Sequence, residues 1–349
     1  MTKVQRKTSS YLLVALLSWG APAAFAEEPS QGQAPSVAPE LNADSQALMA
    51  ELVQQGLPQD WLKDALGQAA YTQSVLDAME GAAERRLKWH EYRAIFLTQQ
   101  RIEEGAEFIE AHAQAFARAE NIYGVPAEII AAIIGVETYY GRHKGQHRVL
   151  DSLATLAFYH PTRGSFFRGE LAAFLRIAYE QDVEPGELHG SYAGAMGYPQ
   201  FIPTSYQAYA VDFDDDGRRD LWDNPVDAIG SVANYFSEHG WRAGEAIYHQ
   251  ATGPDELSSA LRQQLSFNQT SSPSVSIAQL AAHGVESVEP FDDDMLVMPL
   301  AFEFADGEIG YRLGENNFYV ITRYNHSHLY AMAVTELSEA IAALHEEQR

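Results

Sequence analysis

The sequence predicts a mainly α-helical protein of the α+β class. Three observations predict it: long stretches rich in Ala, Leu, Glu and Gln carry apolar residues at helical spacing, residues 244–317 contain strand-like runs and turns, and the 349 residues are 46% hydrophobic and 20% charged. This composition is typical of a packed globular protein and excludes collagen-like, fully disordered and multipass membrane proteins.

Charge and cysteine content exclude several classes of function. The 48 acidic residues outnumber the 23 basic ones, giving a formal net charge of -25. Such a surface repels phosphate backbones and anionic lipids, so we expect no nucleic acid partner. With no Cys, disulfides, thiol catalysis and Cys-ligated metal centres are excluded, and we expect no lipid anchor, because a bacterial lipoprotein is lipidated on a Cys.

The first 26 residues have the pattern of a cleavable secretory signal. A basic head at Lys3, Arg6 and Lys7 precedes a short apolar run over residues 11–17, and Ala24-Phe25-Ala26 supplies the small-x-small site of signal peptidase. The apolar run is shorter than the roughly 20 residues that span a bilayer. We therefore expect export with cleavage after Ala26 rather than an uncleaved membrane anchor.

Helices are expected from residue 41 onward, after a flexible Pro-, Ser-, Gln- and Gly-rich lead over residues 27–40. Residues 41–123 carry apolar side chains at helical spacing, as at Leu62, Ala65, Leu66 and Ala69. Pro126 begins the best-defined helix, whose apolar stripe of Ile129, Ile130, Ile133 and Ile134 ends near Gly141. Further helices are predicted over residues 150–160, 165–181 and 225–239.

The region after residue 244 predicts a small β-containing insert. Residues 295–304, a turn at Asp306-Gly307 and residues 317–323 are expected to form strands and a hairpin. Residues 330–345 return to a helical pattern, and we expect this helix to pack back on the first helices.

Glu137 continues the apolar stripe near the C-terminal end of its helix. On a 3.6-residue period it shares a face with Ile130, Ile133 and Ile134. Burial and the negative end of the helix dipole both disfavour the carboxylate, so we expect a raised pKa and a protonated acid near neutral pH. A general acid that cleaves a glycosidic bond needs this property. The alternative is a structural Glu bonded to an Arg or a backbone amide.

Residues 191–206 (SYAGAMGYPQFIPTSY) predict an aromatic-rich loop that carries Ser191, Gln200 and Tyr206. Tyr139 and Tyr140 directly follow the candidate acid. Aromatic faces stack on sugar rings, and uncharged hydroxyl and amide groups bond sugar hydroxyls. Together these residues fit a carbohydrate site, while each tyrosine taken singly is more typical of half-buried packing.

An acidic loop carries the D-x-D-x-D-G opening of an EF-hand, at Asp212, Asp214, Asp216 and Gly217. Standard spacing places the closing carboxylate at Asp223, and Asp227 is the rival closing ligand. We expect structural calcium here, the alternative being a solvated acidic turn. No organic cofactor is expected.

Four segments carry a resemblance to the lytic murein transglycosylase B family: GVPAEIIAAIIGVETYYGR (124–142), SYAGAMGYPQFIPTSY (191–206), DFDDDGRRDLWDNPVDAIGSVANYF (212–236) and NFYVITRYNHSHLYAMAV (317–334). The resemblance extends from about residue 41 to the end. It implies a lysozyme-like helical core with an α-helical domain, a small β domain and an EF-hand-like calcium loop. The implied reaction is non-hydrolytic cleavage of peptidoglycan between N-acetylmuramic acid and N-acetylglucosamine, which leaves a 1,6-anhydromuramoyl end.

The expected organisation follows in chain order. A signal peptide (1–26) and the lead (27–40) precede an α-helical domain of residues 41–123 and 330–349. The catalytic core comprises residues 124–243 and 318–329 and includes the calcium loop 212–227, while the β-containing domain comprises residues 244–317.

The resemblance also implies roles for individual residues. Glu137 matches the single catalytic glutamate, acting first as acid and then as base. Implied sugar-binding positions fall on Tyr92, Arg163, Ser191, Gln200, Tyr235, Tyr324, Asn325 and Tyr330. Implied calcium ligands fall on Asp212, Asp214, Asp216, the Arg218 carbonyl and Asp227.

The leading interpretation is a periplasmic enzyme acting on peptidoglycan strands, with other cell-wall enzymes as further candidate partners. One alternative is a hydrolytic muramidase, which uses water and normally a second carboxylate. The other is a catalytically silent peptidoglycan-binding protein in which Glu137 only packs.

Overall fold

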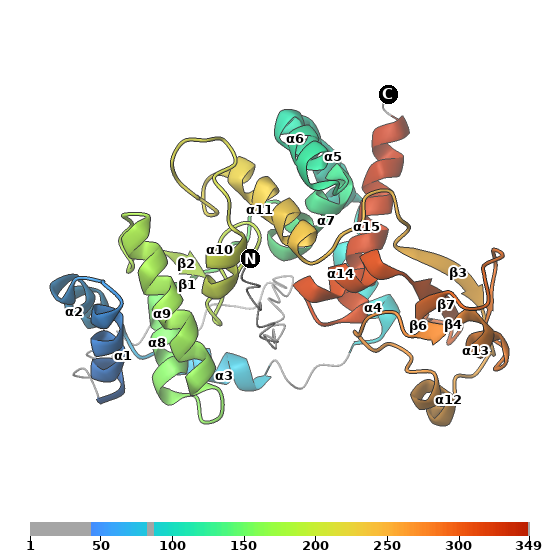
Figure 1. Ribbon diagram of the computed structural model, residues 1–349, viewed down its shortest axis with the longest axis horizontal. Helices are drawn as coiled ribbons and strands as arrows, with labels where there is room; N and C mark the ends of the chain where they lie inside the picture. The colour runs from blue at the N-terminus through green and yellow to red at the C-terminus, as the bar shows by residue number, and fades with distance from the viewer. Residues whose placement is uncertain (1–42, 82–86, 348–349) are drawn as a thin grey trace, which may run out of the picture. The chain divides into compact units, whose positions relative to one another are not determined.

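The computed structural model describes residues 43–81 and 87–347, drawn as ribbons in Figure 1. The expected signal peptide and flexible lead lie outside the described residues. The described chain forms two compact units, one of residues 43–81, 87–245, 302–308 and 333–347, and one of residues 246–301 and 309–332. We call them the helical unit and the β unit.

The helical unit begins with short helices, as the spacing of apolar residues predicts. In chain order these are α1 (Ala43–Gln54), α2 (Gln59–Gly67), α3 (Gln73–Gly81), α4 (Trp89–Phe96), α5 (Gln99–Ala111) and α6 (Ala113–Tyr123). Leu62, Ala65 and Leu66 of α2 are buried, which confirms the predicted stripe there.

Helix α7 (Ala127–Thr138) passes through the core of the helical unit. Pro126 stands at its N-cap, and the side chains of Ile130, Ile133 and Ile134 are fully buried. Apolar residues lie all round α7, which is typical of a helix that other elements cover on every side. The predicted start of this helix and its buried stripe are confirmed.

The remaining elements of the helical unit follow α7 in the chain. They are β1 (His147–Arg148), α8 (Val149–Tyr159), α9 (Gly164–Glu180), β2 (His189–Gly190), α10 (Pro203–Tyr209) and α11 (Pro225–Glu238). The two short strands pair antiparallel, α8 packs along α9, α11 packs on α6, and α5, α6 and α11 all pack on α7. The last helix, α15 (His328–Glu347), reaches this unit with its C-terminal part, where His345 approaches Glu128 of α7 at 3.9 Å.

The β unit is built on a five-stranded sheet. Its elements are β3 (Tyr248–Thr252), α12 (Ser259–Gln264), β4 (Val275–Ser276), α13 (Ile277–Ala281), β5 (Glu286–Ser287), β6 (Leu296–Glu303), β7 (Ile309–Gly314) and α14 (Asn316–Tyr324). The strand order is β4-β6-β7-β3-β5. Phe267, Leu280, Val297 and Leu313 are among the buried side chains of its core.

The predicted strand over residues 317–323 is wrong, because this segment forms helix α14. Aromatic and β-branched residues favour a strand by propensity. The buried side chains, however, include Asn317, Phe318, Ile321 and Thr322, which recur at the three- and four-residue spacing of a helix. Packing of that face outweighs the local preference.

No single helix among the described residues is long and apolar enough to cross a membrane. Helices α6 and α7 together reach the required length and composition, but they meet at a bend of 114°.

Candidate active site

Glu137 is the next-to-last residue of α7, and it is partly exposed on a helix whose other side chains are largely buried. Tyr92 on α4 is 3% exposed. Burial raises the pKa of the Tyr92 hydroxyl, and the negative charge of Glu137 raises it further. The charge of Glu137 therefore acts on the Tyr92 hydroxyl, although the two residues lie far apart in the sequence.

The turn after Glu137 has an uncommon backbone. Tyr139, Tyr140 and Gly141 have φ angles of 53°, 57° and 88°. Residues other than glycine rarely adopt this left-handed region, and such strain persists only where surrounding contacts fix it.

Tyr140 supplies one of these contacts. Its hydroxyl donates to the Arg101 carbonyl at 2.7 Å. Its ring occupies space that two glycines leave, since a Cβ at Gly135 would lie 2.7 Å from the ring and one at Gly105 would lie 2.5 Å from the hydroxyl oxygen. The end of α7 is thereby locked against α5.

The loop over residues 191–206 is held by its own polar side chains. The Ser191 hydroxyl oxygen accepts hydrogen bonds from the amides of Ala193 at 3.3 Å and Ala195 at 3.0 Å. A hydroxyl that accepts twice still carries one O–H to donate. Gln200 has a φ of 49°, and its side-chain amide donates to the carbonyls of Gly197 at 2.9 Å and Lys144 at 3.2 Å.

Tyr235 belongs to a buried aromatic cluster beside this loop. Its ring stacks on His239 with centroids 3.9 Å apart and lies edge-on to Tyr209 at 4.8 Å. Phe201 completes the cluster at 5.7 Å from Tyr235. Tyr206 is likewise buried, and its hydroxyl donates to the Arg219 carbonyl.

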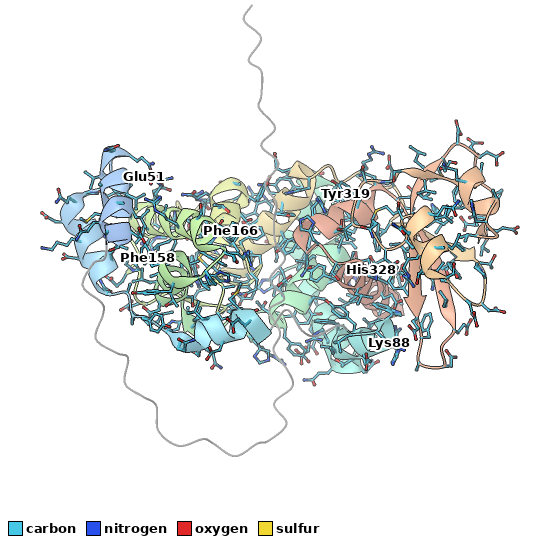
Figure 2. The ribbon with its side chains drawn as sticks, turned by 90° about the horizontal axis from the view of Figure 1, so that it is seen from below. Glu51, Lys88, Phe158, Phe166, Tyr319 and His328 are labelled. Atoms are coloured by element: carbon cyan, nitrogen blue, oxygen red, sulfur yellow. The ribbon has the colours of Figure 1, made fainter. Side chains whose placement is uncertain are left out.

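Arg163 stands at the start of α9 with its guanidinium over the rings of Phe166 at 5.1 Å and Phe167 at 4.9 Å. Phe166 is labelled in Figure 2. Burial lowers the pKa of Arg163. Burial also raises the pKa of Tyr192, and the positive charge of Arg163 partly opposes that rise. Within the described part of the chain, Nη2 of Arg163 is buried without a hydrogen-bond partner.

Three of the implied sugar-binding residues lie together in the β unit. The rings of Tyr324 and Tyr330 are nearly parallel, with centroids 6.4 Å apart and an interplanar angle of 8°. Asn325 lies between them in the sequence and is buried, as is Tyr330. Glu137, Tyr92, Arg163, Ser191, Gln200 and Tyr235 belong to the helical unit.

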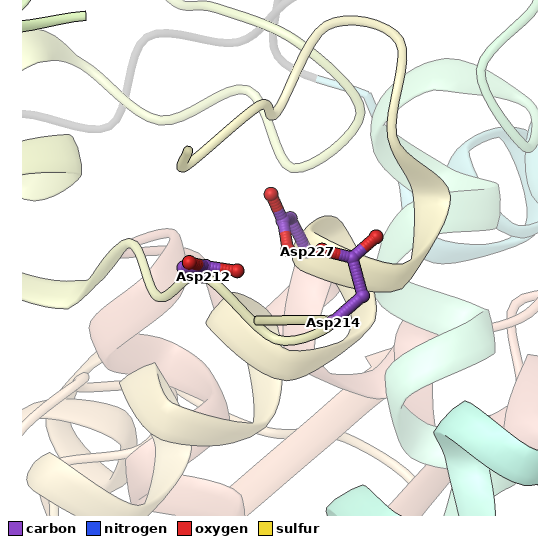
Figure 3. A group of neighbouring side chains, drawn as sticks. All are labelled: Asp212, Asp214 and Asp227. Atoms are coloured by element: carbon purple, nitrogen blue, oxygen red, sulfur yellow. The ribbon is translucent and has the colours of Figure 1, made fainter. Parts of the chain in front are cut away.

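The acidic loop brings three carboxylates together. Asp212 and Asp214 come from the loop and Asp227 from the first turn of α11, and one oxygen from each lies within 4.8 Å of the others (Figure 3). The loop is folded by its own side chains, since Asp212 accepts from the amides of Asp216 at 3.1 Å and Gly217 at 2.8 Å.

Asp227 is the most constrained member of this cluster. It is fully buried, and its two oxygens accept from the amides of Phe213 at 2.6 Å and Asp220 at 2.7 Å. Burial raises its pKa to about 6, and the charges of Asp214 and Asp212 add to the rise. Hard carboxylate oxygens clustered around a shared space suit calcium, whose charge would relieve this repulsion.

The two candidate closing residues are placed differently. Asp227 joins the carboxylate cluster, whereas Asp223 lies 3.3 Å from the ammonium group of Lys144. Asp216 accepts from the Arg218 amide at 2.8 Å and is not part of the three-carboxylate group. The roles of Asp216 and of the Arg218 carbonyl stay predictions.

Sequence reasoning missed the residues that connect these parts. Lys144 donates to the Trp222 carbonyl and so joins the segment after Glu137 to the acidic loop. Thr138 and Tyr198 are joined through a side-chain hydroxyl and a backbone carbonyl. No periodicity or motif marks such contacts between distant segments. The only sequence signal was the proximity of Thr138 to the candidate acid.

Comparison with known proteins agrees with the fold. Residues 40–339 match the family described as transglycosylase SLT domain. The chain is 42% identical over 311 residues to membrane-bound lytic murein transglycosylase B of Escherichia coli K12, covering 86% of this chain and 83% of that protein.

Two solved structures with bound ligands are also similar. The first is the Escherichia coli lytic transglycosylase Slt35 in complex with calcium, with a TM-score of 0.79 and 41% identity over 88% of this chain and 96% of that one. The second is SltB3 from Pseudomonas aeruginosa in complex with NAG-anhNAM-pentapeptide, with a TM-score of 0.73 and 30% identity over 85% of this chain and 78% of that one. The mainly helical fold expected from the sequence is confirmed.

Proposed function

The chain belongs to the transglycosylase SLT family, and we propose that it is a lytic transglycosylase that cleaves the β-1,4 bond between N-acetylmuramic acid and N-acetylglucosamine of peptidoglycan. The observation that supports this most directly is the setting of Glu137. This partly exposed carboxyl group lies in the last turn of a largely buried helix, and its charge acts on the buried Tyr92.

In the proposed mechanism Glu137 acts twice. As an acid it gives its proton to the glycosidic oxygen while the bond from that oxygen to C1 of the muramic acid breaks. As a carboxylate it then takes the proton of the C6 hydroxyl while O6 forms a bond to C1. Glu137 is protonated again at the end, no water is consumed, and the product carries a 1,6-anhydro ring.

The remaining site residues are proposed to hold the glycan. Ser191 and Gln200 offer a hydroxyl and a side-chain amide oxygen on a rigid loop, and the unpaired Nη2 of Arg163 offers a charged donor for a carboxylate or carbonyl. Tyr235, with its neighbouring aromatic rings, and the Tyr324, Asn325 and Tyr330 group supply aromatic and amide surfaces that suit amino sugars. The similar SltB3 enzyme was solved with a peptidoglycan fragment.

We also propose a structural calcium ion in the acidic loop. The carboxylates of Asp212, Asp214 and Asp227 support it, as does the calcium complex of the similar Slt35 enzyme. Its charge would hold the loop together without taking part in the reaction. The pattern of residues 1–26 supports export to the periplasm, where peptidoglycan is the proposed partner.

Product analysis tests the proposed reaction. Purified sacculi are digested with the wild-type protein, with Glu137→Gln, and with Glu128→Gln as a control on the same helix, and the fragments are identified by mass spectrometry. We expect anhydromuramoyl ends from the wild type and the control, and at least about 1000-fold less product from Glu137→Gln, since the variant keeps size but loses the transferable proton. Reducing ends would indicate a muramidase, and equal clearance by Glu137→Gln would exclude its catalytic role.

A further inference from the structure

Thr138 directly follows Glu137 and is the last residue of α7. Its side chain is 1% exposed. Its hydroxyl oxygen lies 3.0 Å from the Tyr198 carbonyl and 3.2 Å from the Ile134 carbonyl, and it accepts from the Gly141 amide at 3.0 Å. One hydroxyl thus bonds both the turn after Glu137 and a distant segment.

Tyr198 is itself held from the opposite side. Its amide donates to the Leu221 carbonyl at 2.8 Å, in the segment where the Asp220 amide is bonded to Asp227. Its ring packs directly on the turn after α7, since a Cβ at Gly141 would lie 2.1 Å from the ring. The peptide groups of Tyr198 therefore connect the end of α7 with the acidic loop.

Gln200 follows two residues later in the same segment. Its left-handed backbone and its two side-chain hydrogen bonds, to Gly197 and to Lys144, leave it little freedom relative to Tyr198. The Thr138 hydrogen bond consequently restricts how far the backbone at Glu137 can move relative to Gln200, because Glu137 directly precedes Thr138 and Gln200 lies two residues after Tyr198.

We propose that Thr138 is a positioning residue for Glu137, because its hydroxyl fixes the end of α7 against the Tyr198 backbone. This inference rests on the proposed function. Thr138 itself does not transfer a proton. It keeps the carboxyl group at a fixed separation from the Gln200 segment, and a displacement of about 1 Å at a reacting group can cost about 100-fold in rate.

The test replaces Thr138 by valine, which keeps the shape of the side chain but removes the hydroxyl and with it the hydrogen bonds to Tyr198, Ile134 and Gly141. The matched control is Thr155→Val on α8, because Thr155 is fully buried and its hydroxyl oxygen accepts from the Thr72 amide at 3.0 Å. Both variants are expected to lower the melting temperature. Turnover is measured below both melting temperatures on a soluble tetrasaccharide of alternating N-acetylglucosamine and N-acetylmuramic acid.

Only Thr138→Val is expected to change the reaction. Its kcat should fall at least about tenfold with KM changed less than about threefold, and its pH–rate profile should shift because the surroundings of Glu137 change. Thr138→Ser, which restores the hydroxyl, should recover kcat to within about threefold of the wild type.

Three outcomes would overturn the inference. One is a wild-type kcat in Thr138→Val, and another is an equal loss of kcat in Thr155→Val. The third is a kcat below about one tenth of the wild type in Thr138→Ser, a result that stays informative even where the valine variant fails to fold. A wild-type protein that does not cleave the substrate would instead overturn the proposed function itself.

Discussion

Glu170 is a buried carboxyl group outside the proposed chemistry, and its replacement gives a sharp test of the packing around the loop. It lies on α9 and is 3% exposed. Its oxygens accept from the Thr204 amide at 3.0 Å and from the Thr204 hydroxyl at 2.8 Å. Thr204 is in the first turn of α10, where amides have no partner within the helix.

The expected magnitudes follow from these two bonds. Glu170→Ala leaves the Thr204 amide unpaired, at about 1–3 kcal/mol, and removes one buried methylene group at about 0.8 kcal/mol. We expect a loss of about 2–4 kcal/mol. Glu170→Gln keeps both contacts as neutral bonds, because its oxygen can accept from the amide and its NH2 group can donate to the hydroxyl oxygen. We expect a change within about 1 kcal/mol.

The dependence on pH separates the wild type from the glutamine variant. Burial raises the pKa of Glu170 above its ordinary value of 4.5, and the bonds from Thr204 only partly oppose this. The native state therefore holds the proton more tightly than the unfolded chain. The free energy of unfolding that this proton contributes is complete below pH 4.5 and is lost as the pH rises through the native pKa of Glu170. The wild type should therefore become less stable relative to Glu170→Gln over that range.

The free energy of unfolding of the wild type, Glu170→Ala and Glu170→Gln is measured by urea unfolding at a series of pH values above 4, with calcium present. The reasoning is refuted if Glu170→Gln loses as much free energy of unfolding as Glu170→Ala at pH 7. It is also refuted if the difference between wild type and Glu170→Gln does not vary with pH.

The remaining predictions concern the acidic loop, the turn after Glu137 and the β unit. Excess chelator should lower the melting temperature by about 5 °C relative to calcium at 100 times its Kd, since bound calcium then contributes about 2.7 kcal/mol; an unchanged transition would exclude the calcium site. Gly135→Ala should destabilise by about 1–3 kcal/mol and reduce turnover, because its Cβ meets the Tyr140 ring at 2.7 Å; a rise in melting temperature at full activity would contradict the packing argument. Burial lowers the pKa of His328 to about 4. The contribution of the neutral His328 ring to the free energy of unfolding is therefore complete above pH 6.5 and is lost as the pH falls through about 4. The wild type should lose up to about 3 kcal/mol more than His328→Gln between these pH values in urea unfolding, with the exposed His189→Gln as control, and equal losses would count against the shift.

The sequence alone predicted most local features of the fold. Pro126 and the isoleucine stripe predicted α7, and the turn at Asp306-Gly307 follows strand β6 as expected. The periodicity of apolar residues indicates which face of an element is buried, and for α7 and β6 this was sufficient. The prediction failed for α14, because its aromatic and β-branched residues favour a strand while its buried residues recur at helical spacing.

The candidate site was predictable only where a motif or an extended local pattern marks it. Glu137 ends a stripe of apolar residues at helical spacing, and the acidic loop has aspartates at alternate positions. Spacing alone left two candidate closing residues, and only the path of the chain shows that Asp223 lies near Lys144 while Asp227 lies in the carboxylate cluster. The effect of the Glu137 charge on Tyr92 and the hydrogen bond between Thr138 and Tyr198 both join segments far apart in the chain, and the spacing of residues in the sequence carries no information about them.

Tyr140 between Gly105 and Gly135 has a consequence for how the sequence can change. The ring and the two missing side chains form one shape, so a larger residue at Gly135 is tolerable only together with a smaller one at position 140. A larger residue at Gly105 also meets Ile341, whose Cδ1 would lie 2.5 Å from the new Cβ, so both Tyr140 and Ile341 must then become smaller. We expect these four positions to substitute as a set among related enzymes and in combinatorial libraries, with each single enlargement selected against.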